Sequence, residues 1–341
     1  MSEQLIINPF DASGFSMATM TESVNLIPNT YGRLRQLGLF MPDPVRTRTI
    51  IVEESNGLLT LLNSQPVGAP PPRKKHGKGK SRSFIIPHIP YEDQIKAEDL
   101  QGMRDPGTIN PKDLAVVMQR HLIEMRSSHA ITEEHLMMGA VKGTILDADG
   151  STIYNLYDEF GITAKSVSFA LTNDATDVDA KCREVVRHIE DNLNGDVMTG
   201  VHCLCDETFF DALIDHPNVE KYFAGHAAFL KNAGIDADPR KGFNFGGIVF
   251  EEYRAKATDP ATGSARAFIA AGKAHFFPVG TANTFKIHYA PANYLETVNT
   301  MGLPIYAKQT MEPKARWIDL NTESNPLPLC RRPGLLVTGS K

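Results

Sequence analysis

The sequence predicts an α+β protein with one long helix, a compact α/β segment and extended arms. Apolar residues recur at helical spacing over residues 110–143, and helical and strand-like patterns alternate after residue 166. Residues 1–45 instead hold short apolar clusters separated by prolines. Because no such cluster is long enough to bury itself, this segment is expected to lie on another surface.

Length and composition narrow the class of protein. A chain of 341 residues is long enough for one large or two modest cores. Its 42% hydrophobic and 22% charged residues are typical of globular proteins. With a net charge of −5, the chain lacks the excess of basic residues that a nucleic-acid-binding protein uses to neutralise phosphates. No secretory signal or apolar run of about 18 residues occurs, so we expect no membrane association and a cytosol-like compartment. Four cysteines are too few for a disulfide framework, and buried free thiols are expected.

A hairpin with a protruding loop is predicted after the arm. Residues 47–62 and 83–89 are strand-like, and between them lie a proline-rich run and a basic run. Proline stiffens such a loop and like charges keep it extended. The candidate contact residues at the loop tip are Arg73, Lys74, Lys75, Lys78, Lys80 and Arg82.

The strongest helical pattern begins after Asn110, which is a good N-cap, and runs to about Gly143. Pro111 suits the first helical position and Asp113 opposes the helix dipole. Two short strands follow, at residues 144–146 and 153–157. They flank the sequence Asp149-Gly150, which favours a tight hairpin turn.

Alternating helices and strands then predict a compact α/β segment. Thr176 is expected to cap a helix, residues 200–205 to form a buried strand, and Asp206 to cap a helix that Pro217 ends. A helix at 219–232 and strands at 247–253 and 267–277 follow. Beyond residue 301 the chain is proline-rich and strand-like again, and we expect it to return to the first domain.

Two motifs resemble ligand sites but lack essential residues. Gly79-Lys80-Ser81 could end a phosphate-binding loop, but Lys74 stands where that loop needs glycine. Asp147 and Asp149 resemble part of a calcium loop, but Ile145 stands at a ligand position. A solvated loop tip and a hairpin turn are the preferred interpretations.

A metal site is a further alternative. His202, Cys203 and Cys205 could bind zinc if Cys182 or His188 completed the set. A single C-x-C pair is weak evidence, however, and free cysteine is among the most buried residue types. The long helix carries histidines and glutamates without H-E-x-x-H spacing, and no hydrolase, dinucleotide or kinase motif occurs. We therefore expect no enzyme activity, catalytic residue, metal or cofactor.

The basic run at residues 73–82 has two functional interpretations besides a solvated loop. It could contact nucleic-acid phosphates or dock on an acidic surface of a neighbouring subunit. Because no aromatic residue is interleaved in it, stacking on single strands is disfavoured. Docking on a neighbour, or simple solvation, is preferred over DNA contact.

The order of arm, basic hairpin, long helix, α/β segment and returning tail resembles the tailed-phage major capsid proteins of the Hong Kong 97-type fold. More narrowly, the chain is similar to the phage lambda major capsid protein E family. The matching segments are residues 200–210, 245–253, 274–280, 289–292 and 327–333. The resemblance covers nearly the whole chain.

The resemblance implies a role for each segment. Residues 1–45 would be the N-terminal arm, 46–100 the extended loop, and 101–165 the peripheral domain with its spine helix at 110–143. Residues 166–300 would form the axial domain around the pentamer and hexamer centres. Residues 301–341 would return to the peripheral domain.

The resemblance also implies partners. Copies of the chain would assemble as hexamers and pentamers into an icosahedral head shell around double-stranded DNA, which it would contact weakly and non-specifically. A separate scaffolding protein, a portal at one vertex and a decoration protein are the other expected partners, and no covalent crosslink is predicted. The expected locations are the virion and, during assembly, the host cytoplasm. The alternatives are an encapsulin-like compartment shell and, less favoured, a metal-dependent enzyme.

Overall fold

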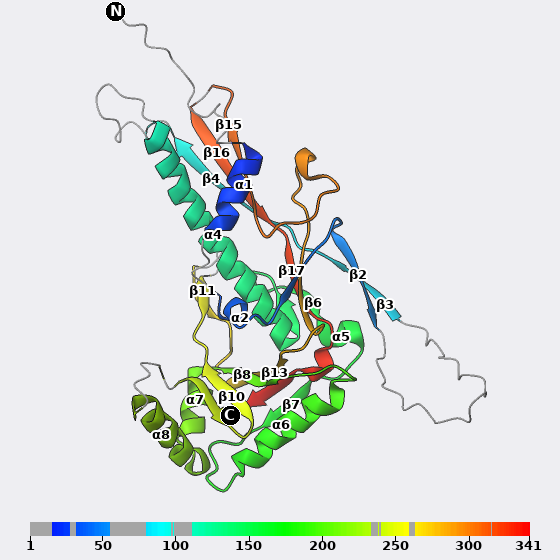
Figure 1. Ribbon diagram of the computed structural model, residues 1–341, viewed down its shortest axis with the longest axis vertical. Helices are drawn as coiled ribbons and strands as arrows, with labels where there is room; N and C mark the ends of the chain where they lie inside the picture. Colours follow the sequence, from blue (N-terminus) through cyan, green and yellow to red (C-terminus); the bar gives the residue numbers. More distant parts are fainter. Residues whose placement is uncertain are drawn as a thin grey trace, which may run out of the picture. The chain divides into compact units, whose positions relative to one another are not determined.

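The computed structural model describes residues 16–27, 32–54, 80–96, 98, 111–232, 238, 240–258, 263–314 and 316–341 (Figure 1). These fall into two compact units. Unit 1 comprises residues 1–50, 85–134 and 287–327, and unit 2 comprises residues 51–84, 135–286 and 328–341. Within the described residues no helix is long and apolar enough to cross a membrane.

Unit 1 is built on a three-stranded antiparallel sheet. Its strands are β4 (Ile89–Lys96), β15 (Tyr306–Met311) and β16 (Trp317–Ser324), in the order β15-β16-β4. Helix α1 (Met17–Leu26) and the first half of α4 (Pro111–Lys142) lie beside this sheet (Figure 1). Their apolar side chains form one core with the sheet, which includes Met20, Val24, Ile95, Met118, Met125, Ala307, Ile318 and Leu320.

Helix α4 confirms the long helix predicted from the sequence. Its 32 residues correspond to about 48 Å at 1.5 Å per residue. The predicted cap, Asn110, lies outside the described residues. At the other end Gly143 adopts a positive φ of 79°, the left-handed conformation that commonly ends helices.

The predicted hairpin after α4 is confirmed. Strands β5 (Thr144–Leu146) and β6 (Thr152–Asn155) pair in antiparallel fashion. At the turn Gly150 has a φ of 88°, and the Asp149 side chain accepts a hydrogen bond from the Ser151 amide at 2.7 Å. Asp149 thus serves the turn, as expected from the hairpin interpretation of this motif. Helix α5 (Leu156–Phe160) follows, capped by Asn155.

Unit 2 contains a six-stranded sheet in the order β7-β18-β13-β8-β10-β9. The strands are β7 (Lys165–Ser168), β8 (Gly200–Cys205), β9 (Lys241–Phe245), β10 (Ile248–Glu252), β13 (Lys273–Val279) and β18 (Val337–Ser340). Strand β8 runs parallel to β10 and antiparallel to β13. Strand β18 runs parallel to β7 and antiparallel to β13, so the sheet is mixed.

Helices cover one face of this sheet (Figure 1). They are α6 (Val178–Asn192), α7 (Glu207–Ile214) and α8 (Pro217–Asn232). Their buried residues share one core with alternate residues of β8, namely Val201, Cys203 and Cys205. Aromatic rings dominate this core; the rings of Phe169 and Phe276, for example, stack with centroids 5.4 Å apart.

Several boundaries in unit 2 differ from the prediction. The N-cap of α6 is Asp177, whose side chain accepts from the Ala180 amide at 2.9 Å, whereas the Thr176 hydroxyl donates to the Ala170 carbonyl. Helix α7 ends at Ile214, as predicted to within one residue, but the next helix begins at Pro217 rather than at residue 219; the missing N–H of proline costs nothing at this first position. The strand expected at 267–277 is two strands, β12 (Ala265–Ala267) and β13.

The end of the chain also differs from the prediction. Residues 301–341 were expected to return together to the first domain, but residues 328–341 belong to unit 2. Strand β18 fills the gap between β7 and β13, with Val337 buried. A Cβ on Gly339 would lie 2.7 Å from the Phe276 ring, so the absence of a side chain lets the strand fit there.

The remaining strands form small sheets. One contains β1 (Met41–Pro44), β14 (Phe285–Tyr289) and β17 (Pro326–Cys330); another pairs β11 (Lys256–Thr258) with β12. Strands β2 (Thr49–Glu54) and β3 (Lys80–Ile85) form a two-stranded sheet. The short helix α2 (Arg33–Gln36) and the 3₁₀ turns Leu295–Thr297 and Pro333–Leu335 complete the described structure.

Candidate functional site

The base of the predicted basic hairpin is present. Strands β2 and β3 pair, and the 25 residues between them, 55–79, lie outside the described residues. The candidate contact residues Arg73, Lys74, Lys75 and Lys78 are in that segment. Lys80 begins β3, so a strand follows Gly79-Lys80-Ser81 where a phosphate-binding loop would need a helix.

Arg82 does not belong to the loop tip. Its Nε donates to the Glu159 carbonyl oxygen at 2.5 Å, and its guanidinium lies 4.5 Å from the centre of the Phe160 ring. Phe84, two residues along β3, is fully buried against the rings of Tyr154 and Phe160. These contacts are all within unit 2. Arg82 therefore anchors the base of the hairpin to α5, and its guanidinium is engaged within its own subunit.

The cysteines are buried thiols, as predicted. Cys182, Cys203, Cys205 and Cys330 are all free and buried. Burial raises the pKa of Cys182 and of Cys330 to about 12, and burial together with Cys205 raises the pKa of Cys203 far above its ordinary value. Thiols with such pKa values are poor nucleophiles and poor metal ligands at neutral pH.

The candidate zinc ligands do not converge. Strand alternation places Cys203 and Cys205 in the helix-covered core and His202 on the opposite face of β8. There the His202 Nε2 lies 3.2 Å from an Oε of Glu251. Among the described residues no group of three or more potential ligands could hold a metal ion. The geometry therefore does not support the zinc interpretation of these residues.

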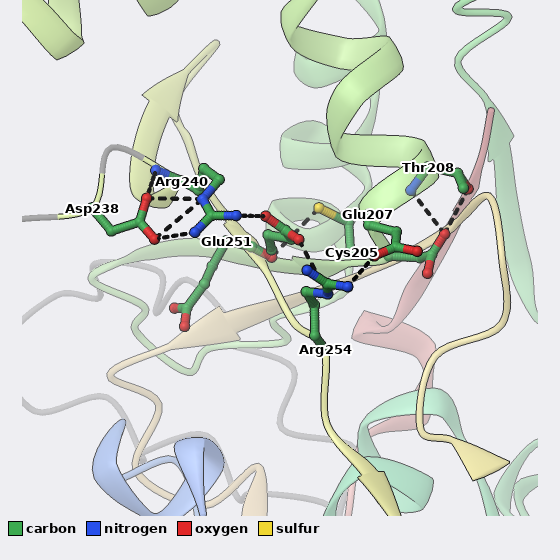
Figure 2. A network of polar contacts seen from close by, with 9 residues as sticks. Cys205, Glu207, Thr208, Asp238, Arg240, Glu251 and Arg254 are labelled. Carbon is green, nitrogen blue, oxygen red and sulfur yellow. Dashed lines mark hydrogen bonds and ion pairs between the residues drawn. The ribbon is translucent and has the colours of Figure 1, made fainter. Parts of the chain in front are cut away.

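A chain of surface ion pairs lies at one end of β9, β10 and α7 (Figure 2). Arg240 forms a two-pronged contact with Asp238, at 3.0 and 2.7 Å, and also reaches Glu252 at 3.3 Å. Arg254 lies 3.7 Å from Glu252 and 2.8 Å from Glu207. The hydrogen bond from Arg240 lowers the pKa of Asp238. The alternating charges link two strand ends to the start of a helix.

Arg254→Gln is expected to reduce the free energy of unfolding by less than about 1 kcal/mol, because both Arg254 and Glu207 are well exposed and solvent screens their attraction. Chemical denaturation at low and at high salt measures this. The difference between variant and wild type should shrink at high salt. A loss of unfolding free energy above about 2 kcal/mol would mean that these ion pairs contribute substantially to the stability of the fold.

Unit 1 contains a buried charged cluster. The Arg35 guanidinium donates to Glu133 at 2.7 Å and to the Tyr289 hydroxyl at 3.1 Å. The Tyr289 hydroxyl in turn donates to Glu133 at 3.1 Å. Next along the helix, Glu134 accepts from the Leu34 amide at 2.9 Å. Two adjacent glutamates of α4 thereby hold the short helix α2 and strand β14.

His129 of α4 is buried in unit 1, where its Nε2 lies 2.9 Å from the Thr322 hydroxyl. Burial, and secondarily the positive charge of Arg126, lower its pKa to about 4. Between this value and about 6.5, the value expected for the unfolded chain, the unfolded state binds the additional proton. Stability contributed by His129 is therefore lost as the pH falls through this window.

We expect His129→Gln to weaken the acid sensitivity of the free subunit. Between pH 7 and pH 4.5 the variant should lose about 2 kcal/mol less unfolding free energy than the wild type, since glutamine does not titrate. Urea denaturation at the two pH values measures the difference. Equal acid sensitivity of the two proteins would show that His129 does not titrate in this way.

The sequence predicted neither the chain of surface ion pairs nor the buried cluster around Glu133. No motif connects Arg35 with Glu133, because these residues are almost a hundred positions apart and the arm approaches the helix only in three dimensions. A weak sequence signal existed for the chain of surface ion pairs, since Arg240 directly precedes β9 and the charged residues Glu252 and Arg254 lie at the end of β10.

Comparison with known proteins identifies the fold. A solved capsid protein from a prophage of E. coli CFT073 matches with a TM-score of 0.57 at 15% identity, covering 95% of this chain and 98% of the other. A phage-related protein of Bordetella bronchiseptica RB50 matches with a TM-score of 0.56 at 12% identity, covering 95% and 96%. These likenesses confirm the predicted α+β fold of the Hong Kong 97 type.

Comparison of sequences identifies the family. The major capsid protein of Pseudomonas phage KPP10 is 33% identical over 346 residues, covering 96% of this chain and 97% of the relative. That of Salmonella phage Felix O1 is 30% identical over 358 residues, covering 96% of each. The family model described as phage major capsid protein E matches residues 16–341. The chain therefore belongs to the phage major capsid protein E family.

Proposed function

We propose that this major capsid protein assembles as hexamers and pentamers into an icosahedral shell, and that each hairpin loop lies over a neighbouring subunit. Membership of the capsid family over residues 16–341 is the observation that carries the proposal. The paired base of the hairpin supports the role of the loop, because the paired strands β2 and β3 are joined by a connection of 25 residues, long enough to reach a neighbour.

Each segment of the chain would have its own role in assembly. Residues 1–45 would act as the N-terminal arm and 46–100 as the extended loop. The peripheral domain would hold α4 as its spine, and residues 166–300 would form the axial domain at the capsomer centres. Unit 2 supports the last assignment, since its sheet and three helices enclose a large core that can present a rigid edge to symmetry mates. Strand β18 would join the axial domain rather than the peripheral one.

The loop tip would act through Arg73, Lys74, Lys75, Lys78 and Lys80. Their charge suits an acidic surface on a neighbour, and with a net charge of −5 acidic side chains outnumber basic ones on every copy. The same net charge weakens any grip on packaged DNA, so contact with the genome would be weak and non-specific. Arg82 takes no part in this proposal, because it is bound to α5.

Other components would complete the particle. A separate scaffolding protein would guide assembly in the host cytoplasm, a portal would occupy one vertex, and a decoration protein could bind the outer surface of the virion. The buried thiols and the divergent His202 and Cys203 favour a structural role over metal-dependent catalysis.

Sedimentation of the expressed protein tests the proposal. The chain, alone or with its scaffolding protein, should form rapidly sedimenting particles of uniform size. Material that stays at the size of a monomer or a small oligomer under both conditions would refute self-assembly. A salt series on immobilised DNA addresses the DNA-binding alternative, which predicts strong retention by the free subunit at low salt.

A further inference from the structure

A tight turn joins helix α6 to strand β8 within unit 2. The Asp196 amide donates to the Leu193 carbonyl oxygen at 3.0 Å, which closes the turn around Asn194 and Gly195. These two central residues have φ angles of 47° and 85°. Positive φ at both central positions is the mark of a type I′ turn, for which Asn-Gly is a favoured pair. The pair lies exposed at the surface.

The reactive groups of this Asn-Gly pair are accessible. Among the residues that the structure describes, neither the Asn194 carboxamide nor the Gly195 amide has a hydrogen-bond partner. Gly195 has no Cβ, so no side chain separates its amide nitrogen from the carboxamide carbon of Asn194. Asn192 differs in both respects, because its side chain donates to the His188 carbonyl oxygen at 2.7 Å and Leu193 follows it.

The turn also anchors the end of the chain. A terminal nitrogen of Arg332 donates to the Leu193 carbonyl oxygen at 2.5 Å and lies 3.6 Å from a carboxylate oxygen of Asp196. Arg332 directly precedes the 3₁₀ turn Pro333–Leu335, and Leu335 is fully buried in the core of unit 2. The Leu193 oxygen thus accepts from both Asp196 and Arg332, so a change in the turn reaches this anchor.

We propose that Asn194 is a site of spontaneous deamidation and that the turn is lost as the protein ages. The turn is exposed and closed by one backbone hydrogen bond, so the opening that the reaction needs costs little free energy. The Gly195 amide nitrogen loses its proton to solvent base and attacks the carboxamide carbon of Asn194. A nitrogen–carbon bond forms, the bond from that carbon to Nδ2 breaks, and ammonia leaves with a proton from water. Water then opens the five-membered imide at either carbonyl, which gives aspartate or isoaspartate.

Isoaspartate has the larger structural effect. It carries the main chain through its side-chain methylene, so the backbone of the turn becomes one carbon longer. The Asp196 amide then no longer lies opposite the Leu193 oxygen, and Arg332 loses the fixed acceptor that the turn provides. Aspartate keeps the length of the backbone and suits the same turn type.

Peptide mass spectrometry of the full-length chain, aged at mildly alkaline pH in water enriched in the heavy oxygen isotope, is the first test. Asn194 should gain three mass units, because one heavy oxygen enters as the nitrogen leaves. Fragmentation localises the gain, and Asn192 in the same tryptic peptide should stay unchanged. The other Asn-Gly pair, Asn56-Gly57, lies outside the described residues and in a different tryptic peptide.

A chain unfolded in urea gives the reference rate. Asn194 in the native chain should react within about tenfold of that rate, because the turn opens easily. An unmodified native Asn194, at times when the unfolded chain is fully converted, would overturn the proposal. Equal conversion of Asn192 in the native chain would overturn it as well.

Hydrogen exchange tests the loss of the turn. Ageing should speed exchange severalfold at Asp196 and in residues 331–336 of the wild type. Asn194→Gly keeps a pair that suits a type I′ turn but has no carboxamide to react, so its exchange should not change with age. Equal exchange in the two aged proteins, with the wild type deamidated, would overturn the loss of the turn.

A fresh Asn194→Asp variant separates charge from backbone length. It adds the negative charge alone and should exchange like the fresh wild type. Faster exchange in this variant would overturn the role of the lengthened backbone. All of these measurements use the free subunit, so they are independent of the proposed function.

Discussion

Deletion of residues 66–79 is expected to abolish closed shells while the subunit still folds. The deleted segment lies outside the paired strands β2 and β3, and the anchor at Arg82 and Phe84 is retained. Each loop contact contributes only a few kcal/mol, but contacts repeated around a closed shell add through multivalency. Their removal from every copy therefore has a large effect on assembly and a small one on the fold.

Two measurements belong to this prediction. Thermal denaturation of the free deletion variant should match the wild type within a few degrees, and sedimentation should show no closed particles. A matched variant with Arg73, Lys74, Lys75 and Lys78 all changed to glutamine keeps the loop length and removes its charge. If charge complementarity drives docking, that variant should also assemble poorly. Its deficit relative to the wild type should be largest at low salt, where the wild-type attraction is strongest. Normal shells from the deletion variant would refute the role of the loop.

Glu133→Ala is expected to have the largest effect on the stability of the subunit, a loss of about 3 to 5 kcal/mol of unfolding free energy. Glu133 is 4% exposed and accepts hydrogen bonds from Arg35 and from the Tyr289 hydroxyl. Its removal leaves these donors unpaired and deprives Arg126 of the nearby negative charge that favours its ionised form. The buried Arg126 guanidinium and the partly exposed Arg35 guanidinium would then repel each other without that compensation.

Glu133→Gln is the matched control. Glutamine keeps the size and an accepting oxygen but removes the charge, so its loss should be smaller than that of alanine. Urea denaturation of both free subunits measures the difference. A loss below about 1 kcal/mol for Glu133→Ala would mean that water replaces the carboxylate and that the cluster is not effectively buried.

Sequence patterns correctly predicted those helices, turns and strands whose formation depends on neighbouring residues in the sequence. The periodicity of α4, the turn at Asp149-Gly150 and the buried strand β8 depend on residues close in sequence. The cysteines were placed correctly because alternation along one strand puts Cys203 and Cys205 on the same face. The family resemblance added the fold, which depends on the order of such elements.

Long-range pairing was not predictable in the same way. Nothing in the sequence of β18 distinguishes a place in the sheet of unit 2 from a return to the first domain. The close approach of Gly339 to the Phe276 ring is visible only in the folded structure. The Nε of Arg126, which has no hydrogen-bond partner among the described residues, likewise could not be predicted, because neither periodicity nor a motif reveals how a single guanidinium nitrogen is paired in the folded chain.

Electron microscopy of particles assembled from the expressed chain, with scaffolding protein where needed, tests the central claim most directly. The account predicts closed icosahedral shells of hexamers and pentamers, in which the density of residues 55–79 of each subunit lies over a neighbouring subunit. Open aggregates, or closed shells in which that density contacts only its own subunit, would contradict it.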